Sequence, residues 1–354
     1  MHHVMKKIFL LFLFVAGVSC IERKSIEKVS VQLLSSGFVY ETDAIPSCHA
    51  STLVETDGGL LAAWFGGSYE SHPDVSIYCA SFDGSGWSAP VLAADGVVSD
   101  TLRYPCWNPV LFRLENGSIV LFYKVGPNPR EWWGEYKISA DDGLSWRESV
   151  SLPAGMLGPI KNKPLALPDG RILYPTSVEY TPDNWKVFVE SSDKDLSDWQ
   201  ITPVDNNGFN AIQPTFFFYG HKLEMLCRTQ EGVLAGAAST DFGRTWTPLH
   251  GTELQNNNSG IDGIVLEDGL RLLVCNPVRE GRNKLAVLGS YDGANWRTLL
   301  LLEDEPAGEF SYPAIIALRD GTIGITYTYN RKRIKYVNLR ARRPRVEQKS
   351  LIFN

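Results

Sequence analysis

The sequence has no cluster of basic residues in its main body, and it carries more acid than base. Its 354 residues include 34 Lys and Arg against 40 Asp and Glu, a formal net charge of −6. Because nucleic-acid binders need grouped cations to neutralise phosphates, we expect no nucleic-acid partner. The basic run at 340–345 is interpreted as solvated chain beyond the last strand.

Cofactor and metal motifs are missing as well. The chain has no phosphate-binding glycine loop, no nucleophile elbow and no Cys or His pair at zinc spacing, so we expect no cofactor and no metal. No stretch of ten residues keeps a 3.6-residue apolar period, so helix should be minor. Cysteine is scarce, and five cysteines besides Cys20 are interpreted as small buried hydrophobes, namely Cys48, Cys79, Cys106, Cys227 and Cys275.

The apolar run 8–15 is too short to span a bilayer. It follows Lys6 and Lys7 and precedes the small residues 16–19 and then Cys20. This order is typical of an export signal and resembles that of a bacterial lipoprotein, in which the Cys becomes the lipidated first residue. We predict that residues 1–19 are removed and that the protein is periplasmic or a surface lipoprotein anchored through Cys20, with plain secretion as the alternative.

What the sequence does have is glycine, tryptophan and a repeat. Two segments, 139–146 and 239–246, fit Ser-x-Asp-x-Gly-x-x-Trp without a gap. Degenerate copies end at Trp87, Trp199 and Trp296, so the repeat recurs about every fifty residues. We interpret these turns as structural, because Ser and Asp hold the turn backbone while Trp packs between units.

A second signal follows the same period. Six turn glycines each lead into an apolar run of strand type, at Gly58, Gly117, Gly170, Gly220, Gly269 and Gly321. Six four-stranded units predict an all-β fold, a six-bladed β-propeller. We divide the chain into the signal 1–19, an N-terminal segment 20–34 whose residues 28–34 close the last blade, the propeller 35–340 and a tail 341–354.

The entrances to the six innermost strands should surround one pocket, because inner strands start at the same face of a propeller. In four units a Pro follows a polar or aromatic residue there and should fix the preceding backbone. The candidates in these entrances are His49, Trp107, Asn108, Lys161, Asn162, Lys163, Gln213, Asp262, Glu309 and Tyr312. Loops after the second strands add Asp74, Arg228 and Arg331, with Glu179, Arg130, Arg279 and Arg282 at the rim. Aromatic, amide and cationic groups together suit a carbohydrate that carries a carboxylate.

The repeats resemble the Asp-boxes of the sialidase superfamily, the bacterial neuraminidase repeats. Segments 48–54, 107–112, 158–164 and 309–314 are similar to a bacterial group of exported sialidase-like proteins. The resemblance implies three arginines that bind a sialate carboxylate, a Tyr nucleophile with a Glu base, and an acid/base Asp. Tyr312, Asp74 and Arg228 match these roles.

The sequence departs from the family pattern at three places. The entrance expected to hold the first Arg reads Cys-His-Ala-Ser at 48–51, and Gln213 occupies the position of the Glu base. The third Arg has no clean match, since the fifth unit offers Asn276 and then Arg279. Sialic acid itself is therefore not implied as the substrate.

The leading hypothesis is an exported, monomeric glycoside hydrolase that releases a terminal, acidic sugar from a glycan. Asp74 would be the general acid/base and Tyr312 or Glu309 the nucleophile or base, with the other candidates positioning the sugar. One alternative is a glycan-binding surface lipoprotein that has lost catalysis. Another is a polysaccharide lyase that uses His49, Tyr312 and Arg228.

Overall fold

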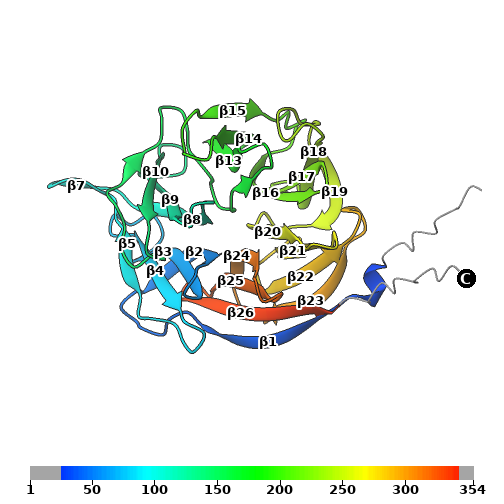
Figure 1. Cartoon of the computed structure of the whole chain (residues 1–354), viewed down its shortest axis with the longest axis horizontal. Helices are drawn as coiled ribbons and strands as arrows, with labels where there is room; N and C mark the ends of the chain where they lie inside the picture. Colours follow the sequence, from blue (N-terminus) through cyan, green and yellow to red (C-terminus); the bar gives the residue numbers. More distant parts are fainter. Residues whose placement is uncertain (1–24, 343–354) are drawn as a thin grey trace, which may run out of the picture.

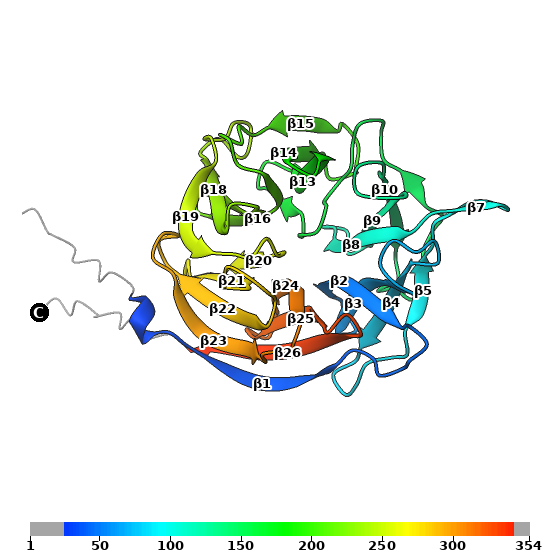
Figure 2. The same ribbon diagram turned by 180° about the vertical axis from the view of Figure 1, so that it is seen from behind.

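A computed structural model describes residues 25–342 of the chain. The export signal, Cys20 and the tail beyond residue 342 lie outside the described residues. Six antiparallel sheets of four strands each form a ring, as Figure 1 and, from behind, Figure 2 show. The prediction of a six-bladed, all-β propeller is confirmed. Within residues 25–342 the one helical element is the 3₁₀ turn η1 (Ile26–Lys28), and no helix is long and apolar enough to cross a membrane.

Each blade is one four-stranded sheet whose first strand lies innermost. The first three blades are β2 (Ser47–Glu55), β3 (Leu60–Gly67), β4 (Ser76–Phe82) and β5 (Val91–Ala94); β8 (Cys106–Arg113), β9 (Ile119–Val125), β10 (Trp133–Ser139) and β11 (Val150–Ser151); and β12 (Leu165–Ala166), β13 (Ile172–Thr181), β14 (Asn184–Ser192) and β15 (Gln200–Pro203). A hairpin of β6 (Val97–Ser99) and β7 (Leu102–Arg103) projects outward between the first two blades (Figure 2).

The other three blades continue around the ring. They are β16 (Ala211–Tyr219), β17 (Lys222–Thr229), β18 (Val233–Ser239) and β19 (His250–Gln255); β20 (Asp262–Val265), β21 (Arg271–Cys275), β22 (Lys284–Ser290) and β23 (Arg297–Asp304); and β24 (Phe310–Ala317), β25 (Ile323–Tyr329), β26 (Arg333–Arg342) and β1 (Ser30–Phe38). The N-terminal strand β1 pairs antiparallel with β26, so it closes the last blade as predicted. It runs to Phe38, beyond the expected end at residue 34.

The blades pack face to face through apolar side chains. One cluster joins Ala63 and Ile77 of the first blade to Leu111 and Leu121 of the second, all almost fully buried. All five described cysteines are buried and free, which confirms their interpretation as small hydrophobes. Burial of such surface supplies most of the favourable free energy of folding.

The Asp-boxes lie between the third and fourth strands of their blades and hold the turn backbone. Ser139 Oγ donates to Asp141 Oδ1 at 2.7 Å and accepts from the Gly143 N–H at 2.8 Å, while Asp141 accepts from the Ser145 N–H at 2.9 Å. The box at 239–246 has the same bonds. Their polar groups are thus used within the turns, as the structural interpretation requires.

Gly143 tests how far an Asp-box depends on close packing against the preceding blade. Its φ is +87°, and a Cβ added there would lie 2.5 Å from a methyl of the buried Leu61. The turn glycine Gly170 has a similar φ of +85° and nothing within 4 Å. Both Gly→Ala changes incur left-handed strain, so we expect Gly143→Ala to lose about 1–3 kcal/mol more in urea unfolding. Equal losses would show that the contact with Leu61 is unimportant.

Candidate functional site

Four innermost strands begin with the same backbone irregularity. Ala50, Asn108, Gln213 and Tyr312 have φ of 54°, 41°, 54° and 53°, and each lies at a shift in strand register. Three of them precede a proline, and a residue before proline favours extended backbone. The backbone at these strand entrances is left-handed instead of extended. Left-handed backbone in non-glycine residues is strained and clusters at functional sites. Such bulges redirect side chains, here at one face of the ring.

Tyr312 lies at the centre of a hydrogen-bonded group. Arg228 Nη1 donates to Tyr312 Oη at 2.8 Å and to Gln213 Oε1 at 3.1 Å, and Gln213 Nε2 lies 3.3 Å from the same phenol oxygen. Arg228 Nε donates to Asn258 Oδ1 at 2.9 Å, which fixes the guanidinium further. Two N–H groups thus converge on one phenol oxygen. The structure thus brings together three of the predicted site residues.

Two guanidinium groups from consecutive blades lie beside the Tyr312 ring, and a third, from the next blade, acts on His49. The Cζ atoms of Arg228 and Arg282 lie 5.7 and 5.8 Å from the centre of the Tyr312 ring. Arg331, in the turn between β25 and β26, is held beside the entrance of β2, because its carbonyl accepts from the Cys48 N–H at 2.8 Å. Of the two rim arginines predicted in the fifth unit, Arg279 is exposed and Arg282 approaches Tyr312.

Arg331 is not free for an anion. Its Nε donates to Glu309 Oε1 at 2.7 Å, and its Nη1 donates to Glu70 Oε2 at 2.6 Å. Glu309 also lies 3.5 Å from Arg282 Nη1. Two carboxylates therefore offset part of the positive charge, mainly at Arg331, while Arg228 forms no ion pair among residues 25–342.

His49 packs on Tyr312 and is neutral. The ring centres are 4.0 Å apart, and His49 Nδ1 lies 2.9 Å from Thr328 Oγ1. Burial, followed by the charges of Arg331, Arg282, Arg228 and Lys161, lowers the pKa of His49 well below 6.5. Its Nε2 is buried and has no partner among residues 25–342. This unused nitrogen is available to a ligand or a proton.

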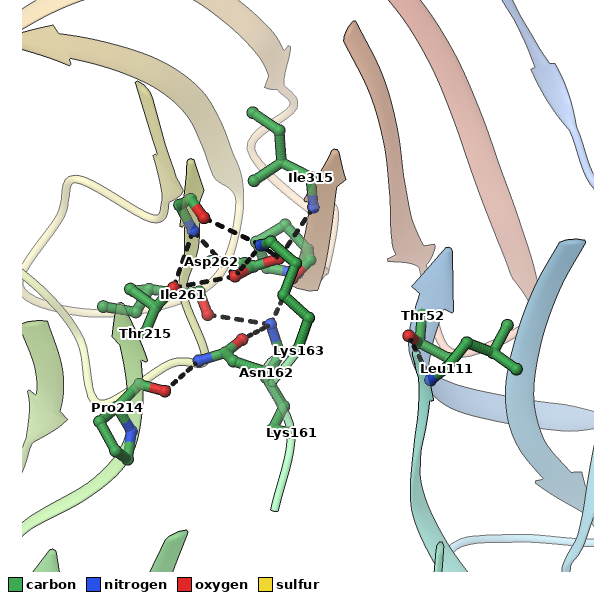
Figure 3. A network of polar contacts seen from close by, with 12 residues as sticks. Thr52, Leu111, Lys161, Asn162, Lys163, Pro214, Thr215, Ile261, Asp262 and Ile315 are labelled. Atoms are coloured by element: carbon green, nitrogen blue, oxygen red, sulfur yellow. Dashed lines mark hydrogen bonds and ion pairs between the residues drawn. The ribbon is translucent and has the colours of Figure 1, made fainter. Parts of the chain in front are cut away.

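A buried carboxylate ties several blades together at the centre of the ring (Figure 3). Asp262 accepts from Thr215 Oγ1 at 2.9 Å, from the Ile315 N–H at 2.9 Å and from Lys163 Nζ at 2.8 Å. The residues come from β16, β20 and β24 and from the chain that enters β12. Both carboxylate oxygens are used. We call this network of Asp262 with Thr215, Ile315 and Lys163 the central tie. Asp262 and Lys163 were predicted to bind the substrate, and we now assign them to the central tie.

Lys161 and Asn162 belong to the same central tie. Lys161 Nζ donates to the carbonyls of Ile261, at 2.9 Å, and Pro313, and Asn162 Nδ2 donates to the carbonyls of Gln213 and Pro214 at 3.1 and 2.9 Å. Burial lowers the pKa of Lys161 to about 7. These side chains hold the backbone around Tyr312 and Gln213, so their role in the structure is to position the site.

A buried pair supports the chain segment that leads into the central tie. Lys124 Nζ donates to the Pro159 carbonyl at 2.9 Å, and Glu190 accepts from the Leu157 and Gly158 N–H groups at 2.9 and 2.7 Å. Burial moves both pKa values to about 7, downward for Lys124 and upward for Glu190. The shared role of Lys124 and Glu190 could not be predicted from the sequence, because the two residues belong to different blades.

The remaining predicted residues differ in exposure. Asp74 is half-buried, and its carboxylate accepts from the Ser68 N–H at 3.0 Å and from the Ser68 Oγ at 2.5 Å, with His72 Nδ1 at 2.8 Å. Partial burial opposes ionisation of Asp74, but the bonds from Ser68 and the contact with His72 outweigh it and lower its pKa. Trp107 is buried and donates to the Gly126 carbonyl at 2.8 Å, so it packs the wall and offers no open stacking face. Asn108 is buried, and its side chain has no partner in the described part of the chain.

Other hollows lie away from this site. One of about 830 Å³, between the Asp-boxes of the first two blades, contains none of the residues around Tyr312. The polar side chains that line this hollow mostly form hydrogen bonds to the backbone of the turns. We therefore place the chemistry at Tyr312. Within residues 25–342, no group of three His, Cys, Asp or Glu side chains could hold a metal ion.

The sequence matches the BNR repeat-like domain family over residues 58–325. The comparison with curated proteins gave no match. Among solved structures, a protein of unknown function from Dyadobacter fermentans is 17% identical with a TM-score of 0.74, over 88% of this chain and 100% of that one. The NanB sialidase of Streptococcus pneumoniae is 15% identical with a TM-score of 0.67, over 88% and 70%. A Hadza microbial sialidase is 18% identical with a TM-score of 0.74, over 87% and 68%. These structures share the fold.

The central tie predicts a large cost for Asp262→Asn. The amide offers one acceptor oxygen where the carboxylate accepts from Thr215, Ile315 and Lys163, so we expect the unfolding free energy to fall by about 3 kcal/mol or more. Asp304→Asn is the control, because its ion pair with Lys284 is exposed on both sides and should contribute less than about 1 kcal/mol. Similar losses in chemical denaturation would contradict the role of the tie.

The lowered pKa of His49 predicts a pH dependence of stability. Below pH 6.5 the unfolded chain binds a proton that the folded His49 does not, so folded stability is lost as the pH falls. We expect the wild type to lose up to about 1.4 kcal/mol per pH unit more than His49→Gln in this range. His221→Gln, at an exposed position, is the matched control. Parallel curves for wild type and His49→Gln would contradict a neutral, buried imidazole.

Proposed function

The chain belongs to the BNR repeat-like domain family of the sialidase superfamily, and from this we propose that it is an exported glycoside hydrolase. We propose that it releases a terminal acidic sugar from a glycan. The observation that carries the proposal is the pair of arginines beside Tyr312, with Arg228 Nη1 2.8 Å from the phenol oxygen and Arg282 Cζ 5.8 Å from the ring centre. Guanidinium groups bind carboxylates by paired, charge-assisted hydrogen bonds.

In this proposal the sugar carboxylate binds Arg228 and Arg282. Tyr312 gives its proton to solvent water and reacts as a phenolate that accepts from the N–H groups of Arg228 and Gln213, and its oxygen attacks the anomeric carbon. The glycosidic bond breaks, and Asp74 gives its proton to the leaving oxygen. Water then attacks the same carbon, Tyr312 leaves as phenolate, and Asp74 takes the proton back. Glu309 is the weaker candidate for nucleophile, because Arg331 already holds its carboxylate.

A second candidate function is glycan binding without catalysis. Gln213 stands where the resemblance implies a base, and an amide cannot take the proton of Tyr312. The low pKa of Asp74 also disfavours a general acid at neutral pH. Both observations suit a pocket that has kept its anion site after losing turnover.

A screen of the purified protein tests the proposal. Aryl sialosides, rhamnosides and uronides and intact host and plant glycans are incubated with it, and released sugars are identified by mass. We expect release of an acidic sugar, with kcat reduced at least about 100-fold in Tyr312→Phe and in Asp74→Asn. Tyr219→Phe, at an exposed position, should match the wild type.

Three other results would contradict the assigned roles or support a different function. Turnover that survives in both variants would contradict the assigned roles. Binding in calorimetry with no product from any glycan would support the binding protein. An unsaturated, ultraviolet-absorbing uronate product would support elimination, in which the neutral His49 acts as base.

A further inference from the structure

Glu179 is a half-buried carboxylate near the site that no part of the reaction above uses. It lies near the end of β13, on the face of the ring where Arg228 ends β17 and where the inner strands begin. Within residues 25–342 its side chain has no hydrogen-bond or ion-pair partner. Burying a carboxylate costs free energy when no hydrogen-bond donor replaces the lost water. A ligand that supplies such a donor would recover this free energy.

The strand pairing places Glu179 beside the arginine that holds Tyr312. Glu179 and Trp185 are directly opposite in the pair β13–β14, so their side chains lie on the same face of the sheet. The Cζ of Arg228 lies 5.7 Å from the centre of the Trp185 ring and 5.7 Å from that of Tyr312. Arg228 therefore lies between the Tyr312 ring and the ring of Trp185, on the sheet face that carries Glu179.

Among the described residues, the charged groups near Glu179 form no ion pair with its carboxylate. Burial raises its pKa, and Arg228 from β17 and Arg130 from the β9–β10 loop oppose this without forming an ion pair. Arg228 already gives N–H groups to Tyr312, Gln213 and Asn258. The carboxylate oxygens of Glu179 are thus acceptors beside an anion site, and the anion itself cannot donate to them.

We propose that Glu179 determines specificity by accepting hydrogen bonds from the hydroxyl groups of a sugar whose carboxylate is bound at Arg228. The ligand class is then a sugar acid, which offers an anion and neighbouring hydroxyls, as distinct from a simple carboxylate. This inference rests on the proposed anionic-sugar pocket, and it adds the requirement for hydroxyls.

The test compares the binding of three anions to wild type and Glu179→Gln by calorimetry. D-Glucuronate and N-acetylneuraminate carry hydroxyls, and cyclohexanecarboxylate has the charge alone. Because a hydrogen bond to a charged acceptor is strong, the variant should bind whichever sugar acid the wild type binds at least about tenfold more weakly. It should bind cyclohexanecarboxylate equally or more tightly, because a negative charge near Arg228 is removed. Glu148→Gln, at an exposed position just after the Asp-box 139–146, is the matched control.

The two predicted changes in affinity, weaker for the sugar acid and equal or tighter for cyclohexanecarboxylate, distinguish recognition of hydroxyls from a structural role. If the variant weakens all three anions alike, Glu179 merely keeps Arg228 in place, and the inference is overturned. Unchanged sugar-acid affinity, or a wild type that binds cyclohexanecarboxylate but neither sugar acid, also overturns it while leaving the anion site intact. A wild type that binds none of the three overturns the proposed function as well. Thermal unfolding of each variant confirms that it is folded.

Discussion

The site depends on one buried carboxylate. Asp262 holds the inner strands of the fourth, fifth and sixth blades through Thr215, its own strand and Ile315, and it also binds Lys163. Thr215 lies two residues after Gln213, and Ile315 lies three after Tyr312. The tie therefore fixes the spacing of the two strand entrances whose side chains meet at Arg228. Three donors on one anion make this arrangement cooperative.

The charge at the site is opposite to that of the whole molecule. The chain has a net charge of −6, yet Arg228, Arg282, Arg331 and Lys161 all lie close enough to lower the pKa of His49. Glu309 and Glu70 offset Arg331, and Glu309 also lies 3.5 Å from Arg282 Nη1, so the uncompensated charge is concentrated at Arg228. An acidic surface around a small cationic pocket concentrates the attraction for anions at that pocket.

The fold could be predicted from the sequence because its signals are local. An Asp-box such as 139–146 and a turn such as the one at Gly117 each specify one hairpin, and their period specifies the ring. The strand entrances that form the site followed from the same repeat. Partners across blades could not be predicted: Lys161 contacts Pro313, 152 residues away. The left-handed backbone of Tyr312 was also hidden, because a residue before Pro favours extended backbone and tertiary contacts override this.

Closure of the ring by β1 also constrains the order of folding. Among the described strands β1 comes first along the chain and its partner β26 comes last, with Ser30 opposite Arg342. The ring cannot close until β26 is present, so the earlier blades must persist as an open arc with an unpaired edge. Contacts of such large sequence separation slow folding through the entropy of loop closure. We therefore expect the last step of folding to be the docking of β1 against β26, late and rate-limiting.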